Sequence, residues 1–169
     1  MQRRKFLFGG LLGGALSSLP FRKKAIRLED FGYTAGADNT ESVRLAEAAA
    51  FLKGRALILP KNAHIKLSKD IIFRTNVIGN NAQFEALNSG VFIRVVNKGS
   101  GKQVVEGIKF NGNNISNGIF VDETKNVTVK NCFIENCKDV GISVFESEEV
   151  QLVHNQIEGT PSLILEQNV

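Results

Sequence analysis

Hydrophobic residues recur at a fixed interval in the second half of the chain. Three aliphatic residues are each followed 23 residues later by another: Val127 by Val150, Val129 by Leu152, and Ile134 by Ile157. Two more aliphatic residues extend the pattern. Ile142 follows Ile119 by 23 residues and precedes Leu163 by 21, and Val144 stands in the same relation to Val121 and Leu165. A period of this size is typical of solenoids, in which each repeat packs on its neighbours.

Within each repeat the apolar residues alternate with polar ones, as in Val127-x-Val129. This spacing indicates short strands with one buried face. The strands are separated by Asn, Gly, Asp and Ser, which favour turns. Three strands and three turns use about 23 residues, one coil of a parallel β-helix whose coils stack about 4.8 Å apart. Asn131–Cys132 and His154–Asn155 then share one corner, where an Asn can hydrogen-bond the backbone of a neighbouring coil.

The first half of the chain predicts a cap for this solenoid. Asp38 and Glu41 have the spacing of a capping box, and residues 42–53 read as a helix that stops at Gly54. Its expected apolar face comprises Leu45, Ala48, Ala49 and Leu52. Strands are predicted next, at 57–60, 64–67, 70–73 and 76–79. A helix over the first coil would cover an open strand edge and an apolar bore.

The order of these segments resembles the start of a pectate-lyase-superfamily domain. The matching pieces are Asp30-Phe31-Gly32, Asp38-Asn39-Thr40, the Ala-rich helix, Leu57–Pro60 and Asn76–Gly79. The resemblance covers roughly residues 28–169 and departs from the family at Tyr33–Thr34 and at Lys61–Ala63. It implies an all-β fold: a right-handed, single-stranded parallel β-helix with an N-terminal capping α-helix.

The C-terminal end lacks a visible polar cap. By the repeat count the chain stops midway through a coil, with Leu163-Ile164-Leu165 still apolar. We therefore expect an incomplete β-helix, either because the chain is part of a longer protein or because another subunit covers this end. Self-association through the open C-terminal coil is the corresponding partner prediction.

Charge is distributed unevenly along the 169 residues, whose net charge is +4. Seven of the 21 basic residues and no acid lie in residues 1–27, which leaves 14 basic against 17 acidic residues, a net charge of −3. A faintly acidic body without a basic stripe argues against nucleic acid as a partner.

The first segment reads as an export signal. Arg3-Arg4-Lys5-Phe6-Leu7 precedes a weakly apolar, glycine-rich run to Leu19 and resembles a twin-arginine signal. An ordinary signal containing Arg-Arg, or an uncleaved anchor, is the alternative. The predicted organisation is an export segment at 1–25 and a β-helix domain at 26–169, with the cap at 26–60 and coils at 61–169, in a periplasmic or secreted protein.

Motifs for metal, redox or nucleophilic chemistry are not found. The sequence has no His-Glu-x-x-His, Gly-x-Ser-x-Gly or Cys-x-x-Cys, so no metal or other cofactor is expected. Lys98-Gly-Ser-Gly-Lys102 echoes a phosphate loop but lacks its first glycine and its Ser/Thr, and it reads as a turn. Cys132 and Cys137 are expected to be two buried thiols, with a disulfide as the alternative.

The remaining candidate site is the outward face of the strands around Ile119 and Ile142. If these aliphatic residues point inward, Phe120 lies beside Ser143 and Asp122 beside Phe145, with Glu123 and Glu146 just beyond. Aromatic rings and carboxylates together suit a carbohydrate groove. The candidate binding residues are Phe120, Phe145 and Ser143, and the candidate catalytic acids are Asp122 and Glu146, which one-coil spacing could bring to the separation used by retaining glycosidases.

Simpler interpretations of these residues stay open. Asp122–Glu123 and Glu146–Glu149 also fit solvated turns, and His154 sits at a corner where a structural role competes with that of a base. A lyase-like site calls for Lys and Arg, yet no Arg follows Arg94.

Two functions therefore remain. One is an exported protein that binds or acts on an acidic or neutral polysaccharide, as a lyase, hydrolase or epimerase; whether it is an enzyme is left open. The other is a non-catalytic structural or adhesive module, such as an envelope or tailspike-like protein.

Overall fold

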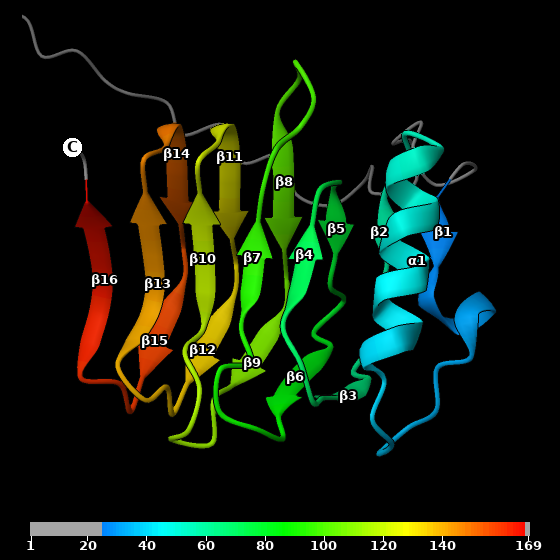
Figure 1. The fold of residues 1–169 in the computed structure, drawn as a ribbon, viewed down its shortest axis with the longest axis horizontal. Helices are drawn as coiled ribbons and strands as arrows, with labels where there is room; N and C mark the ends of the chain where they lie inside the picture. The colour runs from blue at the N-terminus through cyan, green and yellow to red at the C-terminus, as the bar shows by residue number, and fades with distance from the viewer. Residues whose placement is uncertain (1–24, 168–169) are drawn as a thin grey trace, which may run out of the picture.

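The strands of the molecule form three parallel sheets that enclose one bore (Figure 1). The structure is a computed structural model and describes residues 25–167. Sheet A contains β1 (Ile26–Arg27), β2 (Leu57–Ile58), β5 (Val77–Ile78), β8 (Gln103–Glu106), β11 (Lys125–Lys130) and β14 (Glu148–Val153). Sheet B contains β3 (His64–Leu67), β6 (Gln83–Ala86), β9 (Lys109–Asn111), β12 (Phe133–Glu135) and β15 (Gln156–Glu158). Sheet C contains β4 (Ile71–Phe73), β7 (Ile93–Val95), β10 (Ile119–Asp122), β13 (Val140–Phe145) and β16 (Ser162–Gln167).

From β2 onward the chain visits sheets A, B and C in the same order, coil after coil. Val127 pairs with Val150, Ile134 with Ile157 and Ile119 with Ile142, all in parallel. These are the pairs that the 23-residue period predicts, so the parallel β-helix is confirmed.

The register of the last strand differs from the prediction. Ile142 pairs with Ile164 rather than Leu163, and Val144 with Glu166 rather than Leu165. The turn before β16 uses one more residue than the repeat count assumed, because the N–H of Ser162 bonds the carbonyl of Asp139 at 2.9 Å and so sets the register. β16 also gives the last coil its third strand, where the count placed the end of the chain midway through a coil.

The inward side chains stack into a continuous apolar core. Phe73 and Phe84 meet with ring centroids 6.1 Å apart, and Phe110 is also fully buried. Cys132 and Cys137 are buried and unbonded, which confirms the predicted thiols.

Corner residues tie the coils together as expected. The Asn155 side chain accepts a hydrogen bond from the Cys132 N–H at 3.0 Å and donates one to the Val129 carbonyl at 2.9 Å. Asn131 and His154 both adopt a φ of 53° at this corner. A left-handed backbone is the setting in which Asn is the usual residue, and it favours a structural role for His154.

The N-terminal end is covered by η1 (Leu28–Phe31) and α1 (Thr40–Leu52), which lies against the first coil (Figure 1). The predicted cap is confirmed, and Ala49 of its predicted face packs against the core, but Leu45 and Leu52 were wrong, because they are 58% and 83% exposed. Val43, Ala46 and Ala50 face the core instead. The orientation is fixed by Glu47, whose buried carboxylate pairs with Arg74.

The start of α1 also differs from the expected capping box. Asn39 is the N-cap residue and makes no side-chain capping bond, because its amide holds the preceding turn through Thr34 and Ala37. Asp38 accepts hydrogen bonds from the N–H and hydroxyl of Thr40, at 3.0 and 2.6 Å. Among the described residues, no helix has the length and apolar character needed to cross a membrane.

Candidate functional site

The outer face of sheet C carries the residues singled out from the sequence. Phe120 pairs with Ser143 and Asp122 with Phe145 in adjacent strands, as predicted. Both Phe side chains are half-buried, and Ser143 is only 7% exposed. The parallel register therefore brings four of the five candidate residues together on one face.

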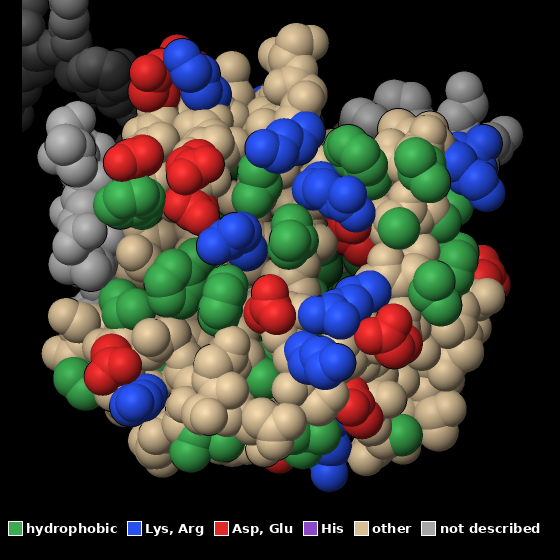
Figure 2. Space-filling view, viewed as in Figure 1, with side chains coloured by type: hydrophobic (Ala, Val, Ile, Leu, Met, Phe, Trp, Pro, Cys, Tyr) green, Lys and Arg blue, Asp and Glu red, His purple; other side chains and the backbone are tan. Residues whose placement is uncertain are grey.

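A shallow hollow of about 170 Å³ opens on this face, beside Asp122. Two apolar side chains, three basic ones and two acidic ones line it: Ile72, Val96, Arg74, Arg94, Lys98, Asp122 and Glu123. Figure 2 shows hydrophobic, basic and acidic side chains interspersed over this face. The hollow thus presents charges of both signs next to apolar surface.

Arg94 links the charged and aromatic parts of the site. Its guanidinium lies 3.3 Å from the Asp122 carboxylate and 5.9 Å from the centre of the Phe92 ring. Phe92 in turn packs on Phe120, with ring centroids 4.9 Å apart and planes tilted by 49°. The site therefore has an aromatic pair with the Arg94 guanidinium over one of its rings.

The other two basic residues are held differently. The guanidinium of Arg74 pairs with the buried Glu47 carboxylate and lies 4.6 Å over the Phe51 ring, so α1 fixes its position. Lys98 stands on the turn between β7 and β8 and has no ion-pair partner among residues 25–167. Residues 98–102 lie in the connection between β7 and β8, as predicted, and Lys98 lines the hollow.

Sequence reasoning missed Arg74, Arg94, Lys98 and Phe92. No Arg follows Arg94, but β7 pairs with β10 and β4 pairs with β7, so the sheet brings Arg74 and Arg94 from earlier coils to the hollow beside Asp122. The register sets Ile93 beside Ile119, 26 residues later, and Val77 beside Val105, 28 residues later. A fixed 23-residue period could not align these longer coils.

The two predicted catalytic acids lie on successive coils. Asp122 lines the hollow, whereas Glu146 follows Phe145 one coil further on and lies outside the lining. Glu123 and Glu146 occupy the turns that follow β10 and β13, with φ values of 45° and 42°. The acidic residue that accompanies Asp122 in the hollow is therefore Glu123.

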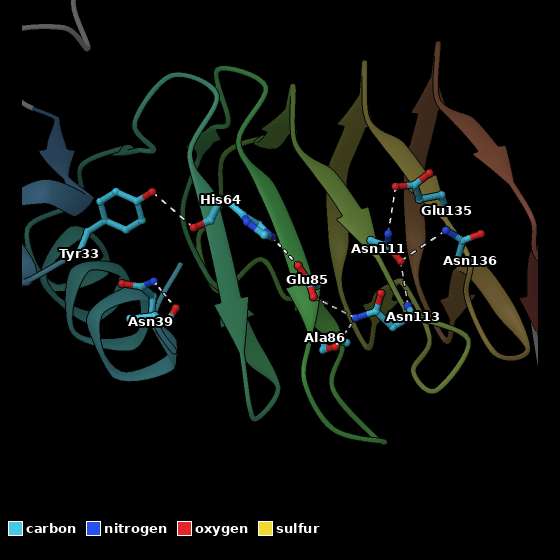
Figure 3. Close-up of polar contacts among 10 residues, drawn as sticks. Tyr33, Asn39, His64, Glu85, Ala86, Asn111, Asn113, Glu135 and Asn136 are labelled. Atoms are coloured by element: carbon cyan, nitrogen blue, oxygen red, sulfur yellow. Dashed lines mark hydrogen bonds and ion pairs between the residues drawn. The ribbon is translucent and has the colours of Figure 1, made fainter. Parts of the chain in front are cut away.

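The outer face of sheet B carries a separate polar network (Figure 3). The Glu85 carboxylate pairs with the His64 ring and accepts a hydrogen bond from the Asn113 amide at 3.3 Å. Burial opposes ionisation, but the bonds from Asn113 and His64 outweigh it and lower the pKa of Glu85. Asn111 donates to Glu135 at 3.2 Å. Partners within the protein occupy these groups, so the network serves to join coils.

Side chains that could bind a metal ion do not cluster in the part of the chain that the structure describes. No three His, Cys, Asp or Glu side chains gather there in a way that could hold a metal ion.

Comparison with known proteins identifies the architecture. Residues 61–167 match the family model described as "Right handed beta helix region". The chain is similar to the solved structure of ORF18 from Geobacillus virus E2, with a TM-score of 0.59 and 14% sequence identity. The match covers 76% of this chain and 29% of that protein, so the chain spans under a third of its length. No curated protein matched the chain. At this identity the likeness is one of fold alone.

Proposed function

For this chain, which belongs to the right-handed β-helix family, we propose that the outer face of sheet C binds an acidic polysaccharide. The observation that carries the proposal is the hollow in which Arg74, Arg94 and Lys98 meet Asp122 and Glu123 beside an aromatic pair. Such a face offers separate groups for the carboxylates, hydroxyls and apolar ring faces of one sugar chain.

The chemistry of each group suits a carboxylate-bearing sugar. Arginine presents a planar fork that matches a carboxylate, and lysine adds a mobile positive charge. Asp122 and Glu123 accept hydrogen bonds from hydroxyl groups. Phe92 and Phe120 supply an apolar surface next to Arg94. Arg74 and Arg94 already pair with Glu47 and Asp122, so Lys98, which has no ion-pair partner among residues 25–167, is the cation open to a carboxylate of an acidic polymer.

Catalysis at this site is proposed for Asp122 alone among the predicted acids. Asp122 lines the hollow, while Glu146 lies outside it. Lyase, hydrolase and epimerase chemistry all call for a positioned acid or base. If the protein turns over a polysaccharide, Asp122→Asn abolishes the product and Glu146→Gln does not. Equal activity of Asp122→Asn and the unmodified chain removes Asp122 as a catalytic residue.

Binding is tested with the full chain in affinity electrophoresis through gels that contain polygalacturonate, dextran sulfate or neutral dextran. Polygalacturonate should retard the chain. Lys98→Ala should lose most of this retardation at low salt, because the positive charge that attracts the carboxylates of the polymer is gone. Lys109→Ala is the matched control, since Lys109 is an exposed lysine on sheet B. Dextran sulfate is negatively charged but has no carboxylates, so retardation in that gel shows binding that depends on charge alone. Unchanged migration in all three gels overturns the proposal.

A structural or adhesive module is the second candidate, and the last coil favours it. Its inward residues Val150, Leu152 and Ile157 are only partly buried, whereas Val127 and Val129 in the preceding coil are fully buried. A second copy of the chain seated on this surface would cover these residues. The fold likeness to a much longer virus protein agrees with a modular role. Light scattering that finds a monomer at every concentration tested removes self-association from the account.

Export remains part of the proposal. The predicted twin-arginine segment at 1–25 falls almost wholly outside the described residues. We propose a periplasmic or secreted location, and fusion of residues 1–25 to a reporter that is active only after export tests it.

A further inference from the structure

A reciprocal hydrogen-bonded pair joins two loops at the edge of the sheet C hollow. The N–H of Asn97 donates to the hydroxyl oxygen of Thr124 at 2.6 Å, and that hydroxyl lies 3.3 Å from the Asn97 carbonyl, to which it donates. Thr124 is 5% exposed. Its own N–H donates to the Ser147 hydroxyl at 3.2 Å in the next coil. The Asn97–Thr124 pair is therefore fixed from both sides.

The Asn97 side chain also shapes the turn between β7 and β8. Its amide nitrogen donates to the carbonyls of Gly101 and Lys125, at 2.7 and 2.9 Å. Its amide oxygen accepts the Gly99 N–H at 2.9 Å. One side chain thus closes the turn on itself and fastens it to the start of β11.

The chain neighbours of this pair are two charged residues that line the hollow from loops. Lys98 follows Asn97, and Glu123 precedes Thr124. Arg74 and Arg94, in contrast, are already engaged by Glu47 and Asp122. Glu123 makes no ion pair within residues 25–167, and its φ of 45° is one that a glutamate rarely adopts. The surrounding contacts must hold such a backbone in place.

We infer that Thr124 and Asn97 are positioning residues, which fix the backbones of Glu123 and Lys98 so that this pair of opposite charges contacts the ligand. The inference rests on the proposed function and specifies how its site is built. The ligand it implies carries a carboxylate for Lys98 and, beside it, a hydroxyl for Glu123. A loop that is already ordered loses less conformational entropy when it binds, so the clamp raises affinity without touching the ligand.

The test measures polygalacturonate binding by the full chain with Thr124→Val, Thr124→Ser and Lys98→Ala. Valine is close in shape to threonine but lacks the hydroxyl, so Thr124→Val should weaken binding about tenfold. Thr124→Ser keeps the hydroxyl and should bind within about twofold of the unmodified chain. Thr40→Val is the matched control, because Thr40 is 3% exposed and its hydroxyl bonds Asp38 in the cap, away from the hollow. Asn97→Ala is a second variant that removes the turn contacts, for use where Thr124→Val does not fold.

Combining substitutions at Lys98, Glu123 and Thr124 distinguishes a positioning role of Thr124 from a general loss of folding. If Thr124 acts through Lys98 and Glu123, adding Thr124→Val to a Lys98→Ala/Glu123→Gln double variant weakens binding no further. Thr124→Val should also lower the salt dependence of affinity as Lys98→Ala does. Weak binding by Lys98→Ala with normal binding by Thr124→Val and Asn97→Ala overturns the clamp and leaves the proposed function standing. Normal binding by Lys98→Ala overturns the clamp as well and removes Lys98 from the proposed site.

Discussion

Gly118 and Gly141 lie against each other in successive coils, at the corner that leads into sheet C. A Cβ built on Gly118 would come within 3.0 Å of the backbone carbonyl oxygen of Gly141, which is closer than real Cβ contacts. The N–H of Gly118 donates to the Val140 carbonyl at 3.1 Å, so the coils cannot separate here without losing that bond. This corner therefore sets how closely β10 and β13 stack.

Gly118→Ala should destabilise the fold by about 1–3 kcal/mol, because the new methyl group meets backbone rather than a side chain that can move aside. Urea unfolding followed by circular dichroism measures the change. Gly101→Ala is the control, since nothing lies within 4 Å of a Cβ at that position. Equal unfolding midpoints for the two variants would mean that the coils are not stacked as described.

Arg94→Gln should weaken polygalacturonate binding about tenfold while changing the free energy of unfolding by less than about 1 kcal/mol. The pair with Asp122 is partly exposed, with side chains 43% and 20% accessible, so it adds little stability. Arg44→Gln is the control: Arg44 pairs with Glu41 and Asp70, outside the hollow. Binding lost equally in both variants would point to overall charge rather than to this site.

Asp38 should make the fold sensitive to acid. Burial opposes its ionisation, but hydrogen bonds from Ser68 and Thr40 outweigh burial and lower its pKa to about 2. The pKa is about 3.9 in an unfolded chain, so the ionised form is favoured by folding. Its stabilisation is present above pH 4 or so and is lost as the pH falls toward 2.

The contribution of Asp38 is measured by how far the urea unfolding midpoint falls between about pH 5 and about pH 2.5 in the unmodified chain and in Asp38→Asn. Asp38→Asn, which keeps an acceptor oxygen but no charge, should show a smaller drop than the unmodified chain. Asp139→Asn serves as the control. Identical drops in Asp38→Asn and the unmodified chain would show that Asp38 does not contribute.

Cys132 and Cys137 should be inert in the folded protein. Their exposed fractions are 2% and 1%, and burial raises the pKa of each thiol to about 11. A thiol of that kind carries almost no thiolate at about pH 8. Ellman's reagent should therefore detect no thiol in the native chain and two after unfolding in urea. Fast native labelling would contradict the packing of this coil.

The coils could be predicted from the sequence because their period is regular where the loops are short. Val127 and Val150 keep equal spacing from their neighbours, so counting residues finds their register. The same count is off by one at Ile164, where the turn is longer. Strand alternation likewise placed Phe120 and Asp122 on the outer face correctly.

The cap and most of the hollow depend on tertiary contacts that a local pattern does not contain. Leu45 and Leu52 form an apolar stripe in the sequence, yet the Glu47–Arg74 pair turns them to solvent. Arg94 reaches Asp122 only because β7 and β10 are adjacent across a coil of 26 residues. The extra residues in these longer coils put Arg94 out of step with the 23-residue period, and they also form the loop that carries Lys98.

The most direct measurement is a crystal structure of the chain with a bound oligogalacturonate. The account predicts density for the sugar along the outer face of sheet C, with a carboxylate at Lys98 or Arg94 and a hydroxyl at Glu123. Density along sheet B, over His64 and Glu85, or no bound sugar at a concentration that saturates binding in solution, would contradict it.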